Sequence, residues 1–454
     1  MSVNALRTLL VIVPLATLAA GVMAAQSPAN GPATLSLGDA ARLAAHNSAQ
    51  VEAAQFDVDQ AEAIVHQRQQ DLLPTYSATA LQSGRTFNTV TFGLNFPTAP
   101  GQPPLFDPRG QVEGPVNTID LRAHVDAALI DPAARQRVQG ARTAVDAALA
   151  NSTSTADAVA GQAAFAYVQV LRAEAELDSK RSDSTLAAGL LGIAQDQLSA
   201  GVGVALDVTR AQAQLANVRS QLIAARNAVA LSRVSLLRTL GLSLDSPVQL
   251  TDSLTTLPLS DSLPSESGAV ATAMSQRPDV RAIEAQIAVV SQQVSAIQAG
   301  RLPTLGLFAD DGWLGGNVLH LLPTYTYGIQ LSVPLFDGKR RADEIEQQTA
   351  LSNQLHVRER DLRQQILLDV RSAMLTLASA REQVASAKEQ VDLGDQEVAE
   401  ARDRFTAGVA GNADVITASL SLTQAHTLLV EALAEYQTAR VALAHAEGTV
   451  TELK

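Results

Sequence analysis

Apolar residues recur every seven positions along several long stretches of this chain. The clearest series runs through Val370, Leu377, Val384, Val391, Val398 and Phe405. The positions interleaved with them are mostly small, namely Ile366, Ala373, Ala380, Ala387, Gly394 and Ala401. A sustained seven-residue repeat is typical of a coiled coil, and small residues let neighbouring helices approach closely. This stretch therefore predicts one helix of a closely packed coiled coil.

The first half of the chain keeps the same repeat. It runs through Val170, Leu177, Leu191 and Leu198, with Ser184 as a lapse. After a short break it resumes from Val208 to Leu236, and in the second half from Val415 to Leu443. The segment from Pro132 to about Ala200 would form a helix of roughly 100 Å at 1.5 Å per residue. We expect two long helical hairpins, with most helical carboxylates on solvated faces.

Two shorter segments alternate strictly between apolar and polar residues. In residues 119–127 the polar positions are Asp120, Arg122, His124 and Asp126, and residues 325–333 alternate in the same way. This length suits a transmembrane β-strand of about 9–11 residues. A half-buried strand of a soluble sheet remains the alternative. Four titratable side chains on one strand face favour a water-filled lumen, because unpaired buried charge is costly.

The chain repeats itself at a spacing of 207 residues. The repeat pairs Gly201 with Gly408, Asp207 with Asp414, Leu215 with Leu422 and Gly241 with Gly448. Upstream, Leu73-Pro74-Thr75 resembles Leu302-Pro303-Thr304. We therefore predict a first repeat in residues 25–241, a linker in 242–265 and a second repeat in 266–454, each with a helix, a β-hairpin and a long coiled-coil hairpin.

The first 24 residues have the pattern of a secretory signal peptide. Arg7 precedes an apolar run from Leu9 to Ala20, and Val22-Met23-Ala24 fits a cleavage site. An uncleaved anchor is the alternative, but the run is shorter than the roughly 20 apolar residues of a spanning helix. We expect an exported chain that starts near Ala25.

The number of predicted strands has a consequence for assembly. Two hairpins give four strands per chain, and the smallest usual barrel has about eight. An open sheet edge cannot lie in lipid, because its backbone groups would lack hydrogen-bond partners. If the strands cross a membrane, several copies of the chain must build one barrel.

These features together resemble the TolC family of outer-membrane efflux proteins. The resemblance rests on the duplicated Leu-Pro-Thr, on Pro334-Leu335-Phe336-Asp337-Gly338, and on the Ala-Gly-Val breaks at 200–202 and 407–409 that precede Asp207-Val208 and Asp414-Val415. Arg277-Pro278-Asp279-Val280 also fits a helix start of the family. These motifs keep the same order in both repeats and cover nearly all of the chain after the predicted signal peptide.

The resemblance implies a mainly α fold with a β-barrel portion. Three chains would form a twelve-stranded barrel in the outer membrane and a long periplasmic α-helical barrel. Such a homotrimer is a passive exit duct that contacts outer-membrane lipid, a periplasmic adaptor and an inner-membrane pump of the RND or ABC type. The family implies no catalysis and no cofactor. Some relatives carry lipid on an N-terminal Cys, which this chain lacks.

The resemblance also assigns roles to the two breaks. Asp207 and Asp414 would form an acidic pore constriction at the periplasmic tip, and Gly201, Val202, Gly408 and Val409 would contact the adaptor. A plain turn is the alternative for these four residues, and helix capping is the alternative for the aspartates. Asp120, Arg122, His124 and Asp126 would line the barrel lumen.

Composition narrows the function further. The formal charge of −13 argues against nucleic acid as a partner, because phosphate binding needs clustered Lys and Arg. The seven His residues are scattered, and no His-Glu-x-x-His, Gly-x-Ser-x-Gly or phosphate-loop motif occurs. We expect no enzyme and no metal site. A periplasmic coiled-coil adaptor or structural protein, and the duct of a type I protein secretion system, remain alternative functions.

Overall fold

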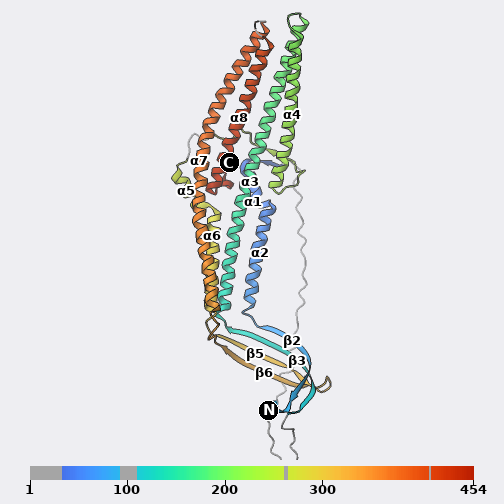
Figure 1. The fold of residues 1–454 in the computed structure, drawn as a ribbon, viewed down its shortest axis with the longest axis vertical. Helices are drawn as coiled ribbons and strands as arrows, with labels where there is room; N and C mark the ends of the chain where they lie inside the picture. The colour runs from blue at the N-terminus through green and yellow to red at the C-terminus, as the bar shows by residue number, and fades with distance from the viewer. Residues whose placement is uncertain (1–32, 93–109, 260–263, 408, 410, 454) are drawn as a thin grey trace, which may run out of the picture.

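The computed structural model describes residues 33–92, 110–259, 264–407, 409 and 411–453. The molecule is a long rod, with helices in its upper and middle parts and a four-stranded sheet at its lower end (Figure 1). The predicted signal peptide and Gly408 lie outside the described residues.

Six helices form the body of the rod. Two of them run from the sheet to the upper tips, α3 (Pro132–Ser199) and α7 (Arg340–Thr406). Two return along the upper half, α4 (Ala205–Thr239) and α8 (Asn412–Glu447). Two accompany the lower half, α2 (Ala49–Gln70) and α6 (Pro278–Ala299). The predicted long helices and the two hairpins are confirmed.

Local sequence explains where α3 starts. The carboxylate of Asp131 accepts a 2.8 Å hydrogen bond from the backbone N–H of Ala134, and Pro132 occupies the first helical turn. A side-chain cap followed by Pro is a strong start signal, because Pro has no N–H to leave unpaired there. The helix is therefore fixed at the point where strand β3 (Val112–Ile130) ends.

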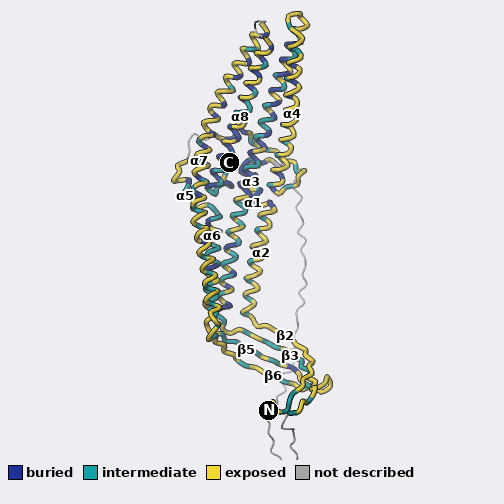
Figure 2. The backbone as a smooth tube through the Cα atoms, in the orientation of Figure 1, coloured by how far each residue is buried: buried dark blue, intermediate teal, exposed yellow. Residues whose placement is uncertain are grey.

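The seven-residue repeat of α7 forms the packed side of that helix, and Figure 2 shows buried stripes along the helices. Val370, Leu377, Val384, Val398 and Phe405 are buried, together with most of the interleaved small residues. The repeat predicts a packed position at Leu198 of α3, and this is wrong, because Leu198 is 40% exposed near the tip. Instead Leu190 packs with Phe405 and Val415, because α3 contacts α8 as well as α4.

A small parallel β-pair crosses the middle of the rod, and the sequence did not predict it. Strand β1 (Ala33–Leu35) pairs with β4 (Val248–Leu250), next to α1 (Leu37–Asn47). The Tyr167 hydroxyl donates to the Leu35 carbonyl and to the Asp252 carboxylate, both at 2.9 Å. Burial, with the neighbouring Asp252, raises the pKa of Tyr167. This network holds the β-pair against α3.

In the second repeat, Arg277 connects the start of α6 to α7. It lies before α6 and after α5 (Glu266–Gln276), and its guanidinium pairs with Asp279 at 2.6 Å and with Asp369 of α7 at 3.2 Å. Burial alone would lower the pKa of Arg277, but the hydrogen bonds that its guanidinium donates to both carboxylates, and their negative charges, raise it. The Arg-Pro-Asp motif therefore fixes the start of α6 against α7.

Two buried charges lie where α3 meets α8. The Lys180 ammonium is 3.4 Å from the Asp183 carboxylate, and their side chains are 11% and 4% exposed. His426 of α8 places Nδ1 at 4.0 Å from the other oxygen of Asp183. Asp183 is an exception to the expectation that most helical carboxylates are solvated, because α3 is covered by neighbouring helices on more than one side.

The lower sheet is antiparallel with the order β2-β3-β5-β6. Its other strands are β2 (Thr75–Asn88), β5 (Thr304–Gly315) and β6 (Leu322–Ser332). The four predicted strands are confirmed: β3 contains the alternating segment 119–127, and β6 contains most of the segment 325–333. Within the described chain, β2 and β6 pair with a strand on one side only.

We expect Tyr167→Phe to lower the free energy of unfolding by about 1–3 kcal/mol, because Leu35 and Asp252 lose a buried donor. Chemical denaturation of the detergent-solubilised protein measures this change. Tyr76→Phe is the matched control, since Tyr76 is 77% exposed. Equal stability of the two variants would contradict a structural role for the network.

We expect Lys180→Met to cost roughly 3–5 kcal/mol, because Asp183 keeps a buried charge without its partner. The double change Lys180→Met/Asp183→Leu removes both charges and should recover most of that loss. The same denaturation measurement reads out both variants. If the double variant were less stable than the single one, the ion pair would not be the source of the effect.

Candidate functional site: the hairpin tips and the polar face of the sheet

The α3–α4 tip is a tight turn built around glycine. Gly201 adopts φ +79°, in the left-handed region that favours glycine. The N–H groups of Val202 and Gly203 both donate to the Gln197 carbonyl, at 3.0 and 2.9 Å. This closes the end of α3 and leaves Val202 79% exposed at the extreme end of the molecule.

The α7–α8 tip has a related arrangement. The Val409 N–H donates to the Arg404 carbonyl at 3.0 Å, and Val409 is 69% exposed. Both predicted tip valines are thus solvent-facing apolar side chains at the same end of the rod. No assignment is made for Gly408, which lies outside the described residues.

Two side chains join the tips to one another. Gln197 Nε2 donates to the Phe405 carbonyl at 3.0 Å, and Asn412 Nδ2 donates to the Asp207 carbonyl at 2.9 Å. Asn412 is fully buried, and its Oδ1 has no hydrogen-bond partner among the described residues. Sequence reasoning missed Asn412, although its place just before Asp414 in the duplicated break was a usable signal.

Asp207 and Asp414 lie in the first turns of α4 and α8. The capping residues are Val204 and Gly411, and neither helix start has a side-chain cap hydrogen bond. Direct capping by the aspartates is therefore wrong, and a favourable helix-dipole interaction is the structural role that fits their position. Asp207 lies 3.9 Å from Arg210, and Asp414 is exposed. Asp414 thus faces solvent, whereas the side chain of Asp207 is 21% exposed.

The polar face of the sheet gathers the four predicted strand residues. Asp120, Arg122, His124 and Asp126 alternate along β3 and lie on one face. Arg122 pairs with Asp120 at 3.0 Å, and His124 Nδ1 lies 2.8 Å from Asp310 Oδ1 of β5. Sequence reasoning missed Asp310, which lies opposite His124 on β5. The face mixes both signs of charge with an acidic excess.

The opposite face of the sheet is apolar and exposed. On β6, Tyr325, Tyr327, Ile329 and Leu331 are each 65–77% exposed, and the two tyrosine rings are stacked at 6.5 Å. Trp313 of β5 lies on the same face, paired with Leu121. Asp311 is an exception on this face, and nothing in the structure explains it. A broad exposed apolar face beside a polar one is what a membrane strand requires.

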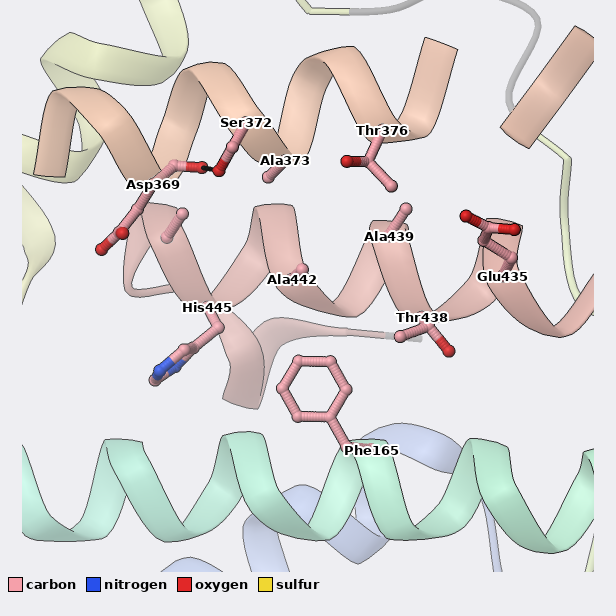
Figure 3. A pocket seen from close by; sticks show the side chains of 11 residues that line it. Phe165, Asp369, Ser372, Ala373, Thr376, Glu435, Thr438, Ala439, Ala442 and His445 are labelled. Atoms are coloured by element: carbon pink, nitrogen blue, oxygen red, sulfur yellow. Dashed lines mark hydrogen bonds between the residues drawn. The ribbon is translucent and has the colours of Figure 1, made fainter. Parts of the chain in front are cut away.

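A cavity of about 430 Å³ lies between α3, α7 and α8. Figure 3 shows the Phe165 ring of α3 facing Thr438, Ala442 and His445 of α8. Asp369 also lines this cavity, and its carboxylate is paired with Arg277. His445 lies 3.7 Å from Asp157, whose pKa is raised by burial. Asp369 and His445 of this cavity thus take part in contacts between elements of the fold.

Among the described residues, no group of three or more His, Asp or Glu side chains is placed to hold a metal ion. None of the described helices has a stretch both long and apolar enough to pass through a membrane.

The model of the family described as outer membrane efflux protein matches residues 40–242 and 269–449 of this chain. The alkaline protease secretion protein AprF of Pseudomonas aeruginosa is 25% identical over 298 residues, 63% of this chain and 60% of AprF. The match thus spans less than two thirds of that relative. The outer membrane efflux protein BepC of Brucella suis is 24% identical over 321 residues, 70% of this chain and 69% of BepC.

Solved structures agree on the fold. The CmeC outer membrane channel of Campylobacter jejuni has a TM-score of 0.73 at 17% identity, covering 91% of this chain and 85% of that chain. The outer-membrane channel OprN has a TM-score of 0.72 at 18% identity, covering 91% and 90%. The outer membrane protein VceC of Vibrio cholerae has a TM-score of 0.69 at 17% identity, covering 91% and 96%.

We expect Asn412→Ala to loosen the two tips, because the Asp207 carbonyl loses its donor and a fully buried side chain is removed. A loss of roughly 1–3 kcal/mol in the stability of the tips makes their local opening about 5- to 150-fold more frequent. Hydrogen exchange of the amides in 200–207 and 405–412 measures it. Asn217→Ala on an exposed face of α4 is the control, and equal exchange in both variants would remove Asn412 from the tip contact.

Proposed function

Because the chain belongs to the outer membrane efflux protein family, we propose that it is a passive exit duct. Three copies form one channel whose sheets span the outer membrane and whose helices extend into the periplasm. The observation that carries this proposal is the four-stranded sheet, which has one apolar exposed face and one charged face. Within the described residues, two of its strands pair on one side only. Membrane insertion of such a sheet requires other copies to complete it.

In this duct Asp120, Arg122, His124 and Asp126 line the water-filled part of the barrel. Their ion pairs, including His124 with Asp310, explain how charged groups are held on the inner face. The apolar face with Tyr325, Tyr327 and Trp313 contacts lipid, where aromatic side chains favour the interface. The polar face then provides a wet path through the membrane.

The opposite end of the duct is the periplasmic entrance. Asp207 and Asp414 of three chains form an acidic constriction, and Gly201, Val202, Gly408 and Val409 form the surface for a periplasmic adaptor. The exposure of Val202 and Val409 supports a docking surface, since apolar side chains gain by leaving water. An inner-membrane pump supplies the energy, and the duct performs no reaction.

The cargo has two candidates. Small-molecule efflux accords with the name of BepC, an outer membrane efflux protein. Protein secretion accords with the name of AprF, an alkaline protease secretion protein, at nearly the same identity. We favour small-molecule efflux as the main function and keep a type I protein secretion duct as the second candidate. A periplasmic adaptor is disfavoured, because the apolar face of the sheet would remain in water.

The test is conductance of the purified protein in planar lipid bilayers. We expect cation-selective pores blocked by divalent ions, with selectivity and block reduced in Asp207→Asn/Asp414→Asn, because carboxylates at a constriction attract cations. Asp57→Asn/Asp59→Asn, which removes two exposed carboxylates of α2, is the control for net charge.

The outcomes separate the two parts of this proposal. If the selectivity and divalent block of the pores are the same in wild type and in Asp207→Asn/Asp414→Asn, the duct is supported and the acidic constriction is contradicted. Repeated failure of the folded protein to form pores contradicts the duct itself.

A further inference from the structure

The cavity of about 430 Å³ in the middle of the rod lies over helix α8, with α3 and α7 as its two walls (Figure 3). These helices belong to a layer whose order is α4, α3, α8, α7. Small residues of α8 form the floor of the cavity and leave the space above it open, namely Thr438, Ala439, Ala442 and Ala446. Sites for small organic molecules have volumes of roughly 300–1,000 Å³, so this cavity is large enough to hold one.

The wall on α3 points away from the elements that surround the middle of the rod. These elements are α1, the β1–β4 pair and α5, and we call them the belt. Tyr167 of α3 faces the belt, because its hydroxyl donates to the Leu35 carbonyl of β1. Phe165 lines the cavity and is two residues from Tyr167, which is about 200° around the helix. Phe165 therefore lies on the side of α3 opposite the belt.

The wall on α7 has the same orientation. Arg371 faces the belt, because it pairs with Glu266 of α5 at 2.6 Å. Asp369 lines the cavity and is two residues from Arg371, again about 200° around the helix. Both walls thus face away from the belt, and the cavity opens on the other side of the helical layer.

The side away from the belt is the inner side of the proposed duct. Three copies related by rotation about one axis form a closed ring, which has less room inside than outside. The belt adds two helices and a β-pair to one side of each helical layer, so it fits on the outside. The cavity then faces the channel, and three copies place three such cavities at one level of its wall.

The lining of the cavity carries negative charge. Two lining residues are carboxylates, Asp369 and Glu435, and none is Lys or Arg. Asp369 is paired with Arg277 at 3.2 Å. Glu435 is exposed and has no ion pair among the described residues. Glu435 therefore supplies one uncompensated negative charge at the rim.

The lining also offers an aromatic ring and apolar surface to the same ligand. The Phe165 ring faces the cavity from α3, and the face of an aromatic ring attracts a cation (Figure 3). Ala373, Ala439 and Ala442 provide apolar surface that gains by covering apolar groups of a ligand. An anion would be repelled by Glu435, and a small inorganic cation would leave the apolar surface uncovered.

We infer that this cavity is a binding site for organic cations that carry aromatic or aliphatic groups, on the inner wall of the duct. This inference rests on the proposed duct and narrows its cargo to organic cations. Weak binding at three sites on the wall raises the concentration of such cations inside the channel, because a charged and enclosed surface attracts ions of opposite sign.

The first test measures ligand binding to the trimer in lipid nanodiscs by calorimetry, with empty nanodiscs as the blank. The probe is ethidium, an aromatic cation, and the comparison compound is 8-anilinonaphthalene-1-sulfonate, an aromatic anion. We expect saturable binding of one ethidium per chain. The anion should not compete for this site, because Glu435 repels it.

The second test changes the cavity itself. We expect Glu435→Gln and Phe165→Leu each to weaken ethidium binding about two- to fivefold, since each removes one attraction for a cation. Ala442→Leu keeps the charge, fills part of the cavity and should also weaken binding. Glu389→Gln is the matched control for net charge, because Glu389 is an exposed residue of α7 about 20 Å along the helix from Thr376 at the cavity. It should leave the affinity unchanged.

The outcomes differ from those of the conductance test. Ethidium binding that is equal in wild type and in all three cavity variants, or that the anion displaces equally well, would overturn the site. Binding to dissociated single chains but not to trimers would place another copy over the cavity and would also overturn it. Pores without this binding would support the duct and contradict the site, whereas binding without pores would support the site and contradict the duct.

Discussion

The backbone hydrogen bonds of strands β2 and β6 impose the constraint on which the rest of the structure depends. Each strand pairs on one side only within the described chain, and the sheet has one broad apolar face. In lipid, an unpaired edge costs several kcal/mol for each lost hydrogen bond. A single chain therefore cannot complete the membrane part. Copies that join at the sheet must also lie side by side along the helices above it.

The helical part, like the sheet, has two outer elements along its sides. The layer α4, α3, α8, α7 has α4 and α7 at its sides, directly comparable with β2 and β6 below. Particular polar contacts within one chain align its parts. Tyr167 and Arg277 fix the middle of the rod, while Gln197 and Asn412 align the tips. These contacts fix how far along the rod each residue of α4 and α7 lies, before another copy binds.

Sequence patterns predicted the long helices, the four strands and the family, because heptads, alternation and duplication are local or repeated signals. They missed the β1–β4 pair, since strands of three residues separated by more than 200 positions carry no periodicity. They also missed Asn412, Asp310 and the burial of Asp183. Each of these depends on which helix or strand lies alongside, which one chain segment does not encode by itself. The roles of Asp207 and Asp414 in the pore remain predictions.

The most direct test of the account is a structure of the purified protein in a lipid nanodisc by electron cryo-microscopy. The account predicts three copies around one axis, with β6 of each copy paired to β2 of the next in a closed twelve-stranded barrel. A single copy with both strand edges unpaired, or a ring closed through other elements, would contradict it.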